Sequence, residues 1–106
     1  MTRLLASAEA LAAEGEIEAA AMLAWSAAEA ILRRSAQSAA PELERQSSAR
    51  VLKHLYSLGH IEHATYEKLL LLMQFRNAVA HGFEPRTAAP SIPDVVPDIR
   101  RLQHAA

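Results

Sequence analysis

The chain has no cysteine, which excludes disulfide bonds and thiolate chemistry and is compatible with a reducing compartment. Aromatic residues make up only 5% of the sequence, so aliphatic side chains must fill the core. The three glycines and the small number of β-branched residues argue against a sheet. No apolar run approaches the ~18 residues of a membrane span, and no signal peptide is visible. We therefore expect a cytoplasmic protein without a membrane partner.

Alanine is abundant, with 23 copies among 106 residues, and 51% of the chain is hydrophobic. Alanine has the highest helix propensity, and its small side chain allows helices to pack closely. A chain of this length forms one domain with a modest core. We therefore expect a single all-α domain over residues 1–106, folded as a four-helix bundle of up-and-down type with a short fifth helix.

Apolar residues recur at helical spacing in five segments of the chain. The four main helices are expected at residues 3–14, 16–37, 48–58 and 63–81, and the short terminal helix at residues 94–104. Thr2 is a plausible cap for the first helix, and Gly15 turns the chain into an antiparallel hairpin. Residues 38–48 should form a loop or a short broken helix. Residues 83–93, with three prolines, are expected to form a loop without regular helix.

The helix expected at residues 63–81 contains a run of apolar residues, 69–73, that covers its whole circumference. Such a helix should be central and buried on several sides. A small bundle can cover this girdle only partly, and exposed apolar patches usually mark interfaces. We therefore expect a homodimer in which this helix and the helix at residues 16–37 contribute to the interface.

Three polar residues, Arg76, Asn77 and His81, follow the apolar run at the edge of the expected core. Asn77 and His81 share one helix face, whereas Arg76 and His81 point about 140° apart. One copy of the helix could bring them together only through a long reach of the Arg side chain or a distortion at Gly82. Two copies that cross at a symmetric interface would do so more easily.

An Arg followed by Asn, three further residues, a His and a Gly, here residues 76–82, resembles the signature of the HEPN superfamily (higher eukaryotes and prokaryotes nucleotide-binding). In that family the motif ends a late helix of an α-helical bundle, and residues 22–33 look like the early helix of many small members. The resemblance covers roughly residues 1–85. It implies a metal-independent endoribonuclease of the toxin or defence kind, which cleaves single-stranded RNA at a site composed across a homodimer. An antitoxin or defence-system protein is a possible partner, and no cofactor or metal is implied.

Arg76 and His81 are therefore the candidate catalytic residues, with Asn77 beside them. An Arg holds a phosphate through paired donors and a His titrates near neutrality, which together suffice for attack of the ribose 2′-hydroxyl without metal. In the alternative interpretation, Arg76 pairs with Glu29 or another acid, and His81 caps the helix C-terminus, where a cation is favoured. Asn77 could orient His81 through a side-chain bond, contact the scissile phosphate, or form an ordinary surface pair.

Ser26, Glu29 and Arg33 lie on one face of the helix expected at residues 16–37 and are candidate supporting residues. In HEPN proteins the equivalent helix can supply a polar residue to the site, so Glu29 is expected to face Arg76. The alternative is a surface ion pair between Glu29 and Arg33.

The net charge of −1 gives no global attraction to nucleic acid. Local charge differs, since the middle of the chain is basic and its start acidic. The basic residues are Arg33, Arg34, Arg45, Arg50 and Lys53 against Glu42 and Glu44, and the acidic ones are Glu9, Glu14, Glu16 and Glu18. The simplest interpretation of the basic stretch is a solvated surface.

The remaining aromatic and histidine residues do not indicate a further site. Trp25 and Tyr66 are expected in the core or an interface. The histidines at positions 54, 60 and 63 lack a cysteine or a paired acidic ligand, so no zinc site is expected. In HEPN toxins that pair with a nucleotidyltransferase antitoxin, a Tyr two positions after the His is adenylylated. Phe83 occupies that position here, so the resemblance does not extend to that form of control.

Two other functions remain open from the sequence. The first is a catalytically silent HEPN module that dimerises, binds nucleotide or RNA, or assembles a defence or restriction complex. The second is a helical adaptor in which the Arg and the His are structural.

Overall fold

The computed structural model describes residues 2–85 and 88–105, and these residues form five α-helices, one short 3-10 helix and no strand. The elements are α1 (Thr2–Ala13), α2 (Ile17–Ala39), η1 (Pro41–Leu43), α3 (Ser48–Ser57), α4 (His63–Ala80) and α5 (Ile92–Ala105). The predicted all-α bundle is confirmed, and the first four α-helices lie within two residues of their expected bounds.

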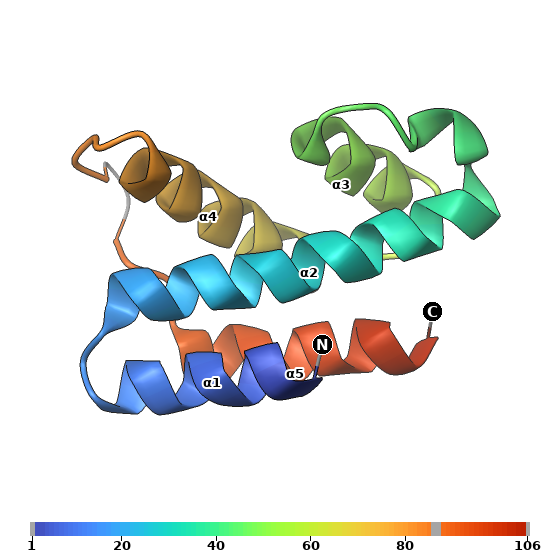
Figure 1. Cartoon of the computed structure of the whole chain (residues 1–106). Coiled ribbons are helices and arrows are strands. Elements are labelled where there is room, and N and C mark those ends of the chain that lie inside the picture. Colours follow the sequence, from blue (N-terminus) through green and yellow to red (C-terminus); the bar gives the residue numbers. More distant parts are fainter. Residues whose placement is uncertain (1, 86–87, 106) are drawn as a thin grey trace.

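The helix at the centre of the bundle is α2, which contacts every other helix. In Figure 1, α1 and α5 lie on one side of α2, and α3 and α4 lie on the other. Five alanines on its inward faces, Ala20, Ala21, Ala24, Ala27 and Ala28, are buried. Their short side chains let neighbouring helices approach closely. The expectation that α4 is the central helix is therefore wrong.

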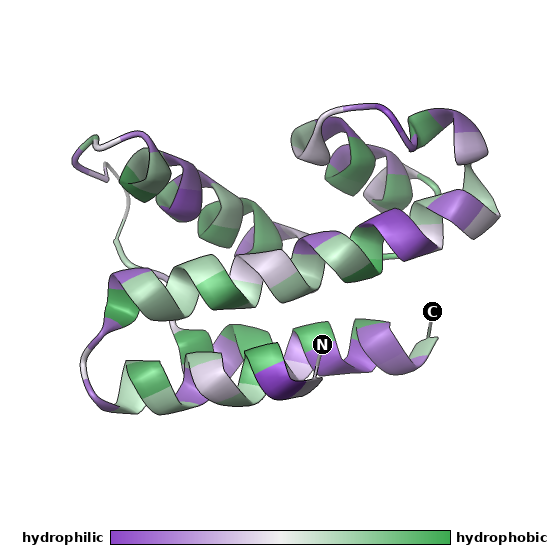
Figure 2. Cartoon of the chain, in the orientation of Figure 1, coloured by the Kyte–Doolittle hydropathy of each residue, from purple (hydrophilic) through white to green (hydrophobic). Residues whose placement is uncertain are grey.

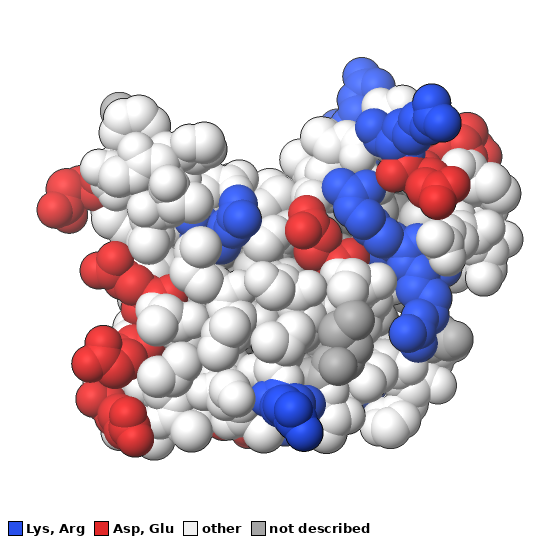
Figure 3. All heavy atoms as spheres, viewed as in Figure 1, with Lys and Arg blue, Asp and Glu red and all other residues white. Residues whose placement is uncertain are grey.

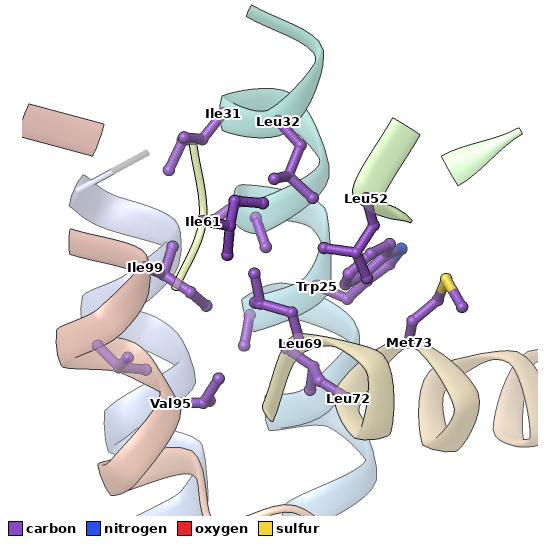
Figure 4. Packing of buried hydrophobic residues seen from close by; sticks show 14 of the residues in the cluster. Trp25, Ile31, Leu32, Leu52, Ile61, Leu69, Leu72, Met73, Val95 and Ile99 are labelled. Atoms are coloured by element: carbon purple, nitrogen blue, oxygen red, sulfur yellow. The ribbon is translucent and has the colours of Figure 1, made fainter. Parts of the chain in front are cut away.

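Trp25 of α2 is the largest fully buried side chain. Figure 4 shows its indole between Leu52 of α3 and Met73 of α4, so this one residue joins three helices. The expectation that Trp25 belongs to the core is confirmed. Figure 2 shows hydrophobic and hydrophilic turns alternating along the helices, with hydrophilic residues in the segment between η1 and α3 and near the end of α5.

The apolar girdle of α4 is mostly covered within one chain. Leu69, Leu72 and Met73 are buried and Leu70 is half-buried, whereas Leu71 is 43% exposed. The expected burial on several sides is confirmed, because α2, α3 and α5 all contact α4. One bundle covers the girdle only partly, as expected, because Leu71 stays exposed, but the exposed part is small. The homodimer stays a prediction that needs other support.

The last helix begins earlier than expected and is longer. Helix α5 starts at Ile92 and has 14 residues, against 12 in α1 and 10 in α3, so it is not a short fifth element. The expectation that no regular helix forms over residues 83–93 is wrong at its end. Pro93 lies in the first turn, where its missing N–H removes no helical hydrogen bond. Thr2 is likewise inside α1 rather than its cap.

A buried polar cluster joins α4 to α5. Asp98 is 4% exposed, and its carboxylate accepts a hydrogen bond from Thr65 at 3.0 Å. Lys68 Nζ lies 3.2 Å from the same carboxylate, and Arg101 pairs with it from one turn further along α5. Burial alone raises the pKa of the Asp98 carboxyl, but the hydrogen bonds from Lys68 and Thr65 and the positive charges of Lys68 and Arg101 outweigh it. The pKa is therefore held below its ordinary value of 3.8.

Candidate functional site at the end of helix α4

A glycine cap fixes the backbone at the end of α4. The N–H of Phe83 donates to the carbonyl oxygen of Ala78 at 2.8 Å, and the N–H of Gly82 donates to that of Val79 at 3.1 Å. Gly82 has φ +74°, a conformation that glycine adopts without strain. These two bonds form a Schellman motif. His81 occupies the C-cap, so its backbone position is set by the same motif.

Arg76 is half-buried in the last turns of α4 and has few partners. One Nη donates to Asn77 Oδ1 at 3.2 Å, and the Nε atom is buried without an acceptor in the described part of the chain. Leaving such a donor unsatisfied costs about 1–3 kcal/mol. No ion pair within residues 2–85 and 88–105 involves Arg76. The alternative in which Arg76 is neutralised by Glu29 or another acid therefore receives no support.

His81 is exposed beside Phe83, which is 70% exposed, and the two ring centroids are 6.4 Å apart. The backbone N–H of His81 donates to the carbonyl oxygen of Asn77 at 3.0 Å. No hydrogen bond between described residues joins the imidazole to Arg76 or to Asn77. The imidazole is therefore open to solvent, at the C-cap position that the alternative interpretation gave it.

Asn77 connects the two candidate residues, but not in the expected way. Its side chain accepts from Arg76, whereas only its backbone carbonyl bonds to His81. The side chain thus helps to hold the guanidinium of Arg76 and does not orient the imidazole. One copy of α4 places Arg76 and His81 near the same helix end, and no hydrogen bond between described residues joins their side chains.

The supporting residues from α2 contact α3 and not the end of α4. Ser48 donates to the carboxylate of Glu29, and Arg33 lies 3.9 Å from the same carboxylate. Arg33 also donates to Ser48 Oγ at 3.1 Å and to the carbonyl oxygens of Glu44 and Gln46, both at 3.2 Å. Glu29 thus pairs with Arg33, as the surface alternative predicted, and no bond to Arg76 is present among the described residues.

Ser26 has a local role. Its hydroxyl donates to the carbonyl oxygen of Met22 at 2.9 Å, one turn earlier in α2. Together with the bonds of Glu29 and Arg33, this means that α2 supplies none of its three candidate residues to Arg76 or His81. Figure 3 shows a hollow between the lobe of α4 and the lobe formed by η1 and α3, with α2 below it. The end of α4 therefore has an open flank.

The structure also forms a polar chain that the sequence reasoning missed. Tyr56 Oη lies 2.8 Å from His63 Nδ1, and His63 Nε2 lies 3.0 Å from Glu67. The ring of Tyr56 stacks on that of Tyr66 at 4.3 Å. The spacing of His63 and Glu67, four residues apart on α4, is the signal that could have indicated part of it. No group of three or more acidic or histidine side chains is placed to hold a metal ion in the described part of the chain.

Comparison with protein-family models, with curated proteins and with solved structures found no match. None of the described helices has both the length and the apolar character needed to cross a bilayer.

Proposed function

We propose that the chain is a metal-independent endoribonuclease of the HEPN toxin or defence kind, which cleaves single-stranded RNA. The observation that carries this proposal is the state of Arg76. Its guanidinium is half-buried, holds one Asn77 oxygen, and has a buried Nε without an acceptor or a neighbouring carboxylate among the described residues. A cation in this condition is suited to an anion from outside the chain, and phosphate matches its paired donors.

The exposed His81 supplies the second requirement. An imidazole side chain can both accept and donate a proton. It could accept the proton of the ribose 2′-hydroxyl as that oxygen attacks the phosphorus, or give a proton to the departing 5′-oxygen. Arg76 would stabilise the negative charge on the phosphate during this step, a contribution of about 3 kcal/mol for one positioned donor.

The separation of the two side chains in one chain supports a composite site. Arg76 and His81 lie about 140° apart around the helix axis, and no hydrogen bond between described residues joins them. A two-fold axis near the end of α4 would place Arg76 of one copy beside His81 of the other. The expected homodimer thus rests on the site itself rather than on the girdle of α4.

The second candidate is a catalytically silent helical module that dimerises or binds RNA. Two observations favour it: His81 is the C-cap of α4, and the residues of α2 do not reach the site. In this function Arg76 could still bind a phosphate group, but no cleavage would follow.

The test is cleavage of a 5′-labelled single-stranded RNA in the presence of EDTA. The wild-type protein should give products that end in a 2′,3′-cyclic phosphate, and a DNA of the same sequence should survive because it lacks the 2′-hydroxyl. His81→Ala should reduce the rate by roughly 100- to 10,000-fold, and Arg76→Ala should reduce it by about 100-fold or more.

Matched controls keep this test specific. His60→Ala and Arg3→Ala remove the same side-chain types from exposed positions outside α4, and both should cleave like the wild type. Circular dichroism must show that every variant is folded. The silent module would become the favoured function if a folded His81→Ala variant cleaved RNA at the wild-type rate. The same would follow if the wild-type protein cleaved no RNA.

A further inference from the structure

A pocket beside η1 and α3 is lined by seven residues, and six of them have polar or charged side chains. Its volume is about 430 Å³, and its lining includes Gln46, Arg50, Lys53, His54 and Ser57. The side chains of these five residues all carry hydrogen-bond donors. The carboxylate of Glu42 is the one acidic group in the lining. The pocket therefore offers an anion many more donors than it has negative charges.

The helical repeat explains why these donors share one surface. Arg50, Lys53, His54 and Ser57 recur at spacings of three and four residues, which places them on one face of α3. The opposite face carries Val51, Leu52 and Leu55, which are buried. Packing of the apolar face against the bundle thus turns the basic face outward.

The charges of this face are not neutralised within the described chain. Arg50 donates to the amide oxygen of Gln46 at 3.2 Å, and no ion pair among the described residues includes Arg50 or Lys53. Both residues are exposed. An amide oxygen orients the guanidinium but leaves its positive charge, so the pocket keeps a positive potential.

The rest of the molecule strengthens this polarity. Figure 3 shows Lys and Arg side chains gathered mostly around η1, α3 and the end of α2, with a few acidic side chains among them and others toward the turn between α1 and α2. Arg34 and Arg45 add to the basic side, whereas Glu14, Glu16 and Glu18 lie near the opposite end. The net charge of −1 thus conceals one basic and one acidic end.

We infer that this pocket binds the phosphodiester backbone of single-stranded RNA, at a site separate from Arg76 and His81. The inference deepens the proposed function and rests on it for the identity of the polymer. Arg50 and His54 lie four residues, ~6 Å, apart along the axis of α3, so they can contact neighbouring phosphates of one strand. Phosphate contacts of this kind hold and orient a strand without reading its sequence.

An acidic protein fits this surface less well than a nucleic acid strand. Protein interfaces have an apolar centre with a polar rim, but the apolar residue that lines this pocket, Leu43, is itself buried. The exposed large apolar residues of the described chain, Leu58, Leu71 and Phe83, are not in the lining. The pocket therefore offers no exposed large apolar side chain to anchor a protein partner.

The experiment measures binding separately from cleavage. A fluorescein-labelled single-stranded RNA of 12 nucleotides is titrated with the His81→Ala variant of the 106-residue chain in EDTA, and the dissociation constant is followed by anisotropy at several salt concentrations. Arg50→Glu and Lys53→Glu, each added to His81→Ala, should each weaken binding by about tenfold at low salt. The slope of log Kd against log salt should fall by about one for each lost contact.

Arg3→Glu is the matched control, because it makes the same change of charge at an exposed position of α1. It should change the dissociation constant by less than about twofold, since it lies outside the pocket. Thermal unfolding should be similar in all variants, because Arg50 and Lys53 are exposed and make no ion pair between described residues. Weakening by Arg50→Glu and Lys53→Glu but not by Arg3→Glu supports the pocket.

The inference is overturned if both pocket variants bind RNA like the parent protein, or if Arg3→Glu weakens binding as much. It is also overturned if poly-glutamate of equal charge competes as well as unlabelled RNA, since an acidic peptide would then be an equal ligand. Failure of the nuclease would look different: RNA binding would depend on Arg50 and Lys53, but the wild-type protein would leave the RNA intact. In the reverse result, the wild-type protein would cleave RNA, but Arg50→Glu and Lys53→Glu would change neither binding nor cleavage. The nuclease would then stand and the pocket inference would fail.

Discussion

Asp98 carries a negative charge into the seam between α4 and α5, and this charge is stabilised only because three partners reach it. Thr65 and Lys68 approach from α4 and Arg101 from α5. Lys68 is partly exposed and Arg101 largely exposed, so their charges remain in contact with solvent while their donors satisfy the carboxylate. The cluster therefore fixes the angle between two helices at a smaller desolvation cost than a fully buried ion pair.

Replacing Asp98 by Asn should lower the free energy of unfolding by about 1–3 kcal/mol at pH 7, because charge-assisted bonds to a buried acceptor are lost. The pKa of Asp98 is lower in the folded chain than in the unfolded one, so its contribution is present above the unfolded value. As the pH falls from about 4 through the folded pKa, the carboxylate is protonated and the advantage of the wild type disappears. Thermal unfolding of both proteins between pH 7 and pH 2, followed by circular dichroism, measures this.

Asp94→Asn provides the comparison, because Asp94 is an exposed acid in the first turn of the same helix. It should cost about 0.5 kcal/mol through the helix dipole. An Asp98→Asn protein that unfolds like the wild type at pH 7, or whose deficit persists at pH 2, would exclude an ionised structural role for Asp98.

Single residues differ in how far the sequence could predict them. Arg76 and His81 could be singled out because their types and spacing carry chemistry, and their positions at the end of α4 follow from the apolar run before them. The burial of Asp98 could not be foreseen, because its partner Thr65 is 33 residues away. The pairing of Asn77 with Arg76 depends on side-chain rotamers, which a helical spacing does not determine.

At the scale of elements, α3 is held to α2 by polar bonds as well as by its apolar face. Arg33 donates to Ser48 and to two backbone carbonyls before α3, and Glu29 accepts from Ser48. These bonds satisfy carbonyl groups of the connecting segment that no helix pairs. They hold the lobe that faces the end of α4 across the hollow in Figure 3.

Arg33→Ala should therefore lower the free energy of unfolding by about 1–3 kcal/mol, measured by urea denaturation. Arg34→Ala, its exposed neighbour in α2, should change it by about 0.5 kcal/mol or less. Glu29→Gln should weaken the same contact, and the double variant should show a coupling of at least about 0.5 kcal/mol.

The same variants decide the role of Glu29. If Glu29 is structural, Glu29→Gln reduces stability while a folded sample cleaves RNA at close to the wild-type rate. Loss of cleavage at unchanged stability would instead return Glu29 to the site, as the sequence first indicated.

Helical periodicity located every main helix, but it did not show which helix lies at the centre of the bundle. The girdle at Leu69–Met73 is the most apolar segment, so the sequence pointed to α4 as the centre. Helix α2 is central because its alanines permit contact on all sides, and alanine contributes little to a hydrophobic pattern. The start of α5 was missed for a related reason, since Pro93 is compatible with a first turn as well as with a loop.

For the whole molecule, the decisive question is whether one functional site uses two chains. Arg76→Ala and His81→Ala proteins, each inactive, should regain activity when mixed and allowed to exchange subunits. Each mixed dimer has one site with both residues intact, so random exchange should restore roughly a quarter of the wild-type rate. The measurement is RNA cleavage before and after exchange, with sedimentation to establish the dimer.

The control is a double variant that carries both Arg76→Ala and His81→Ala. It is mixed with either single variant, and none of the resulting mixed dimers contains a complete site. This mixture should stay inactive. If the mixed single variants form dimers but never regain cleavage, the site is not shared between two chains. Either both residues then act within one chain, or the protein is not a nuclease. A species of 11.6 kDa alone at micromolar concentration would remove the composite site altogether.

The buried alanines of α2 also constrain which sequences could replace this one. A position such as Ala24 or Ala27, with no exposed surface, can lose volume only by becoming glycine, which costs about 1 kcal/mol of helix propensity. It can gain volume only by pushing a neighbouring helix away, which typically costs 1–3 kcal/mol. Substitution by a smaller residue and substitution by a larger one are therefore both destabilising at these positions. The high alanine content of the chain thus follows from the close spacing of its helices, and it does not mean that the sequence is weakly constrained.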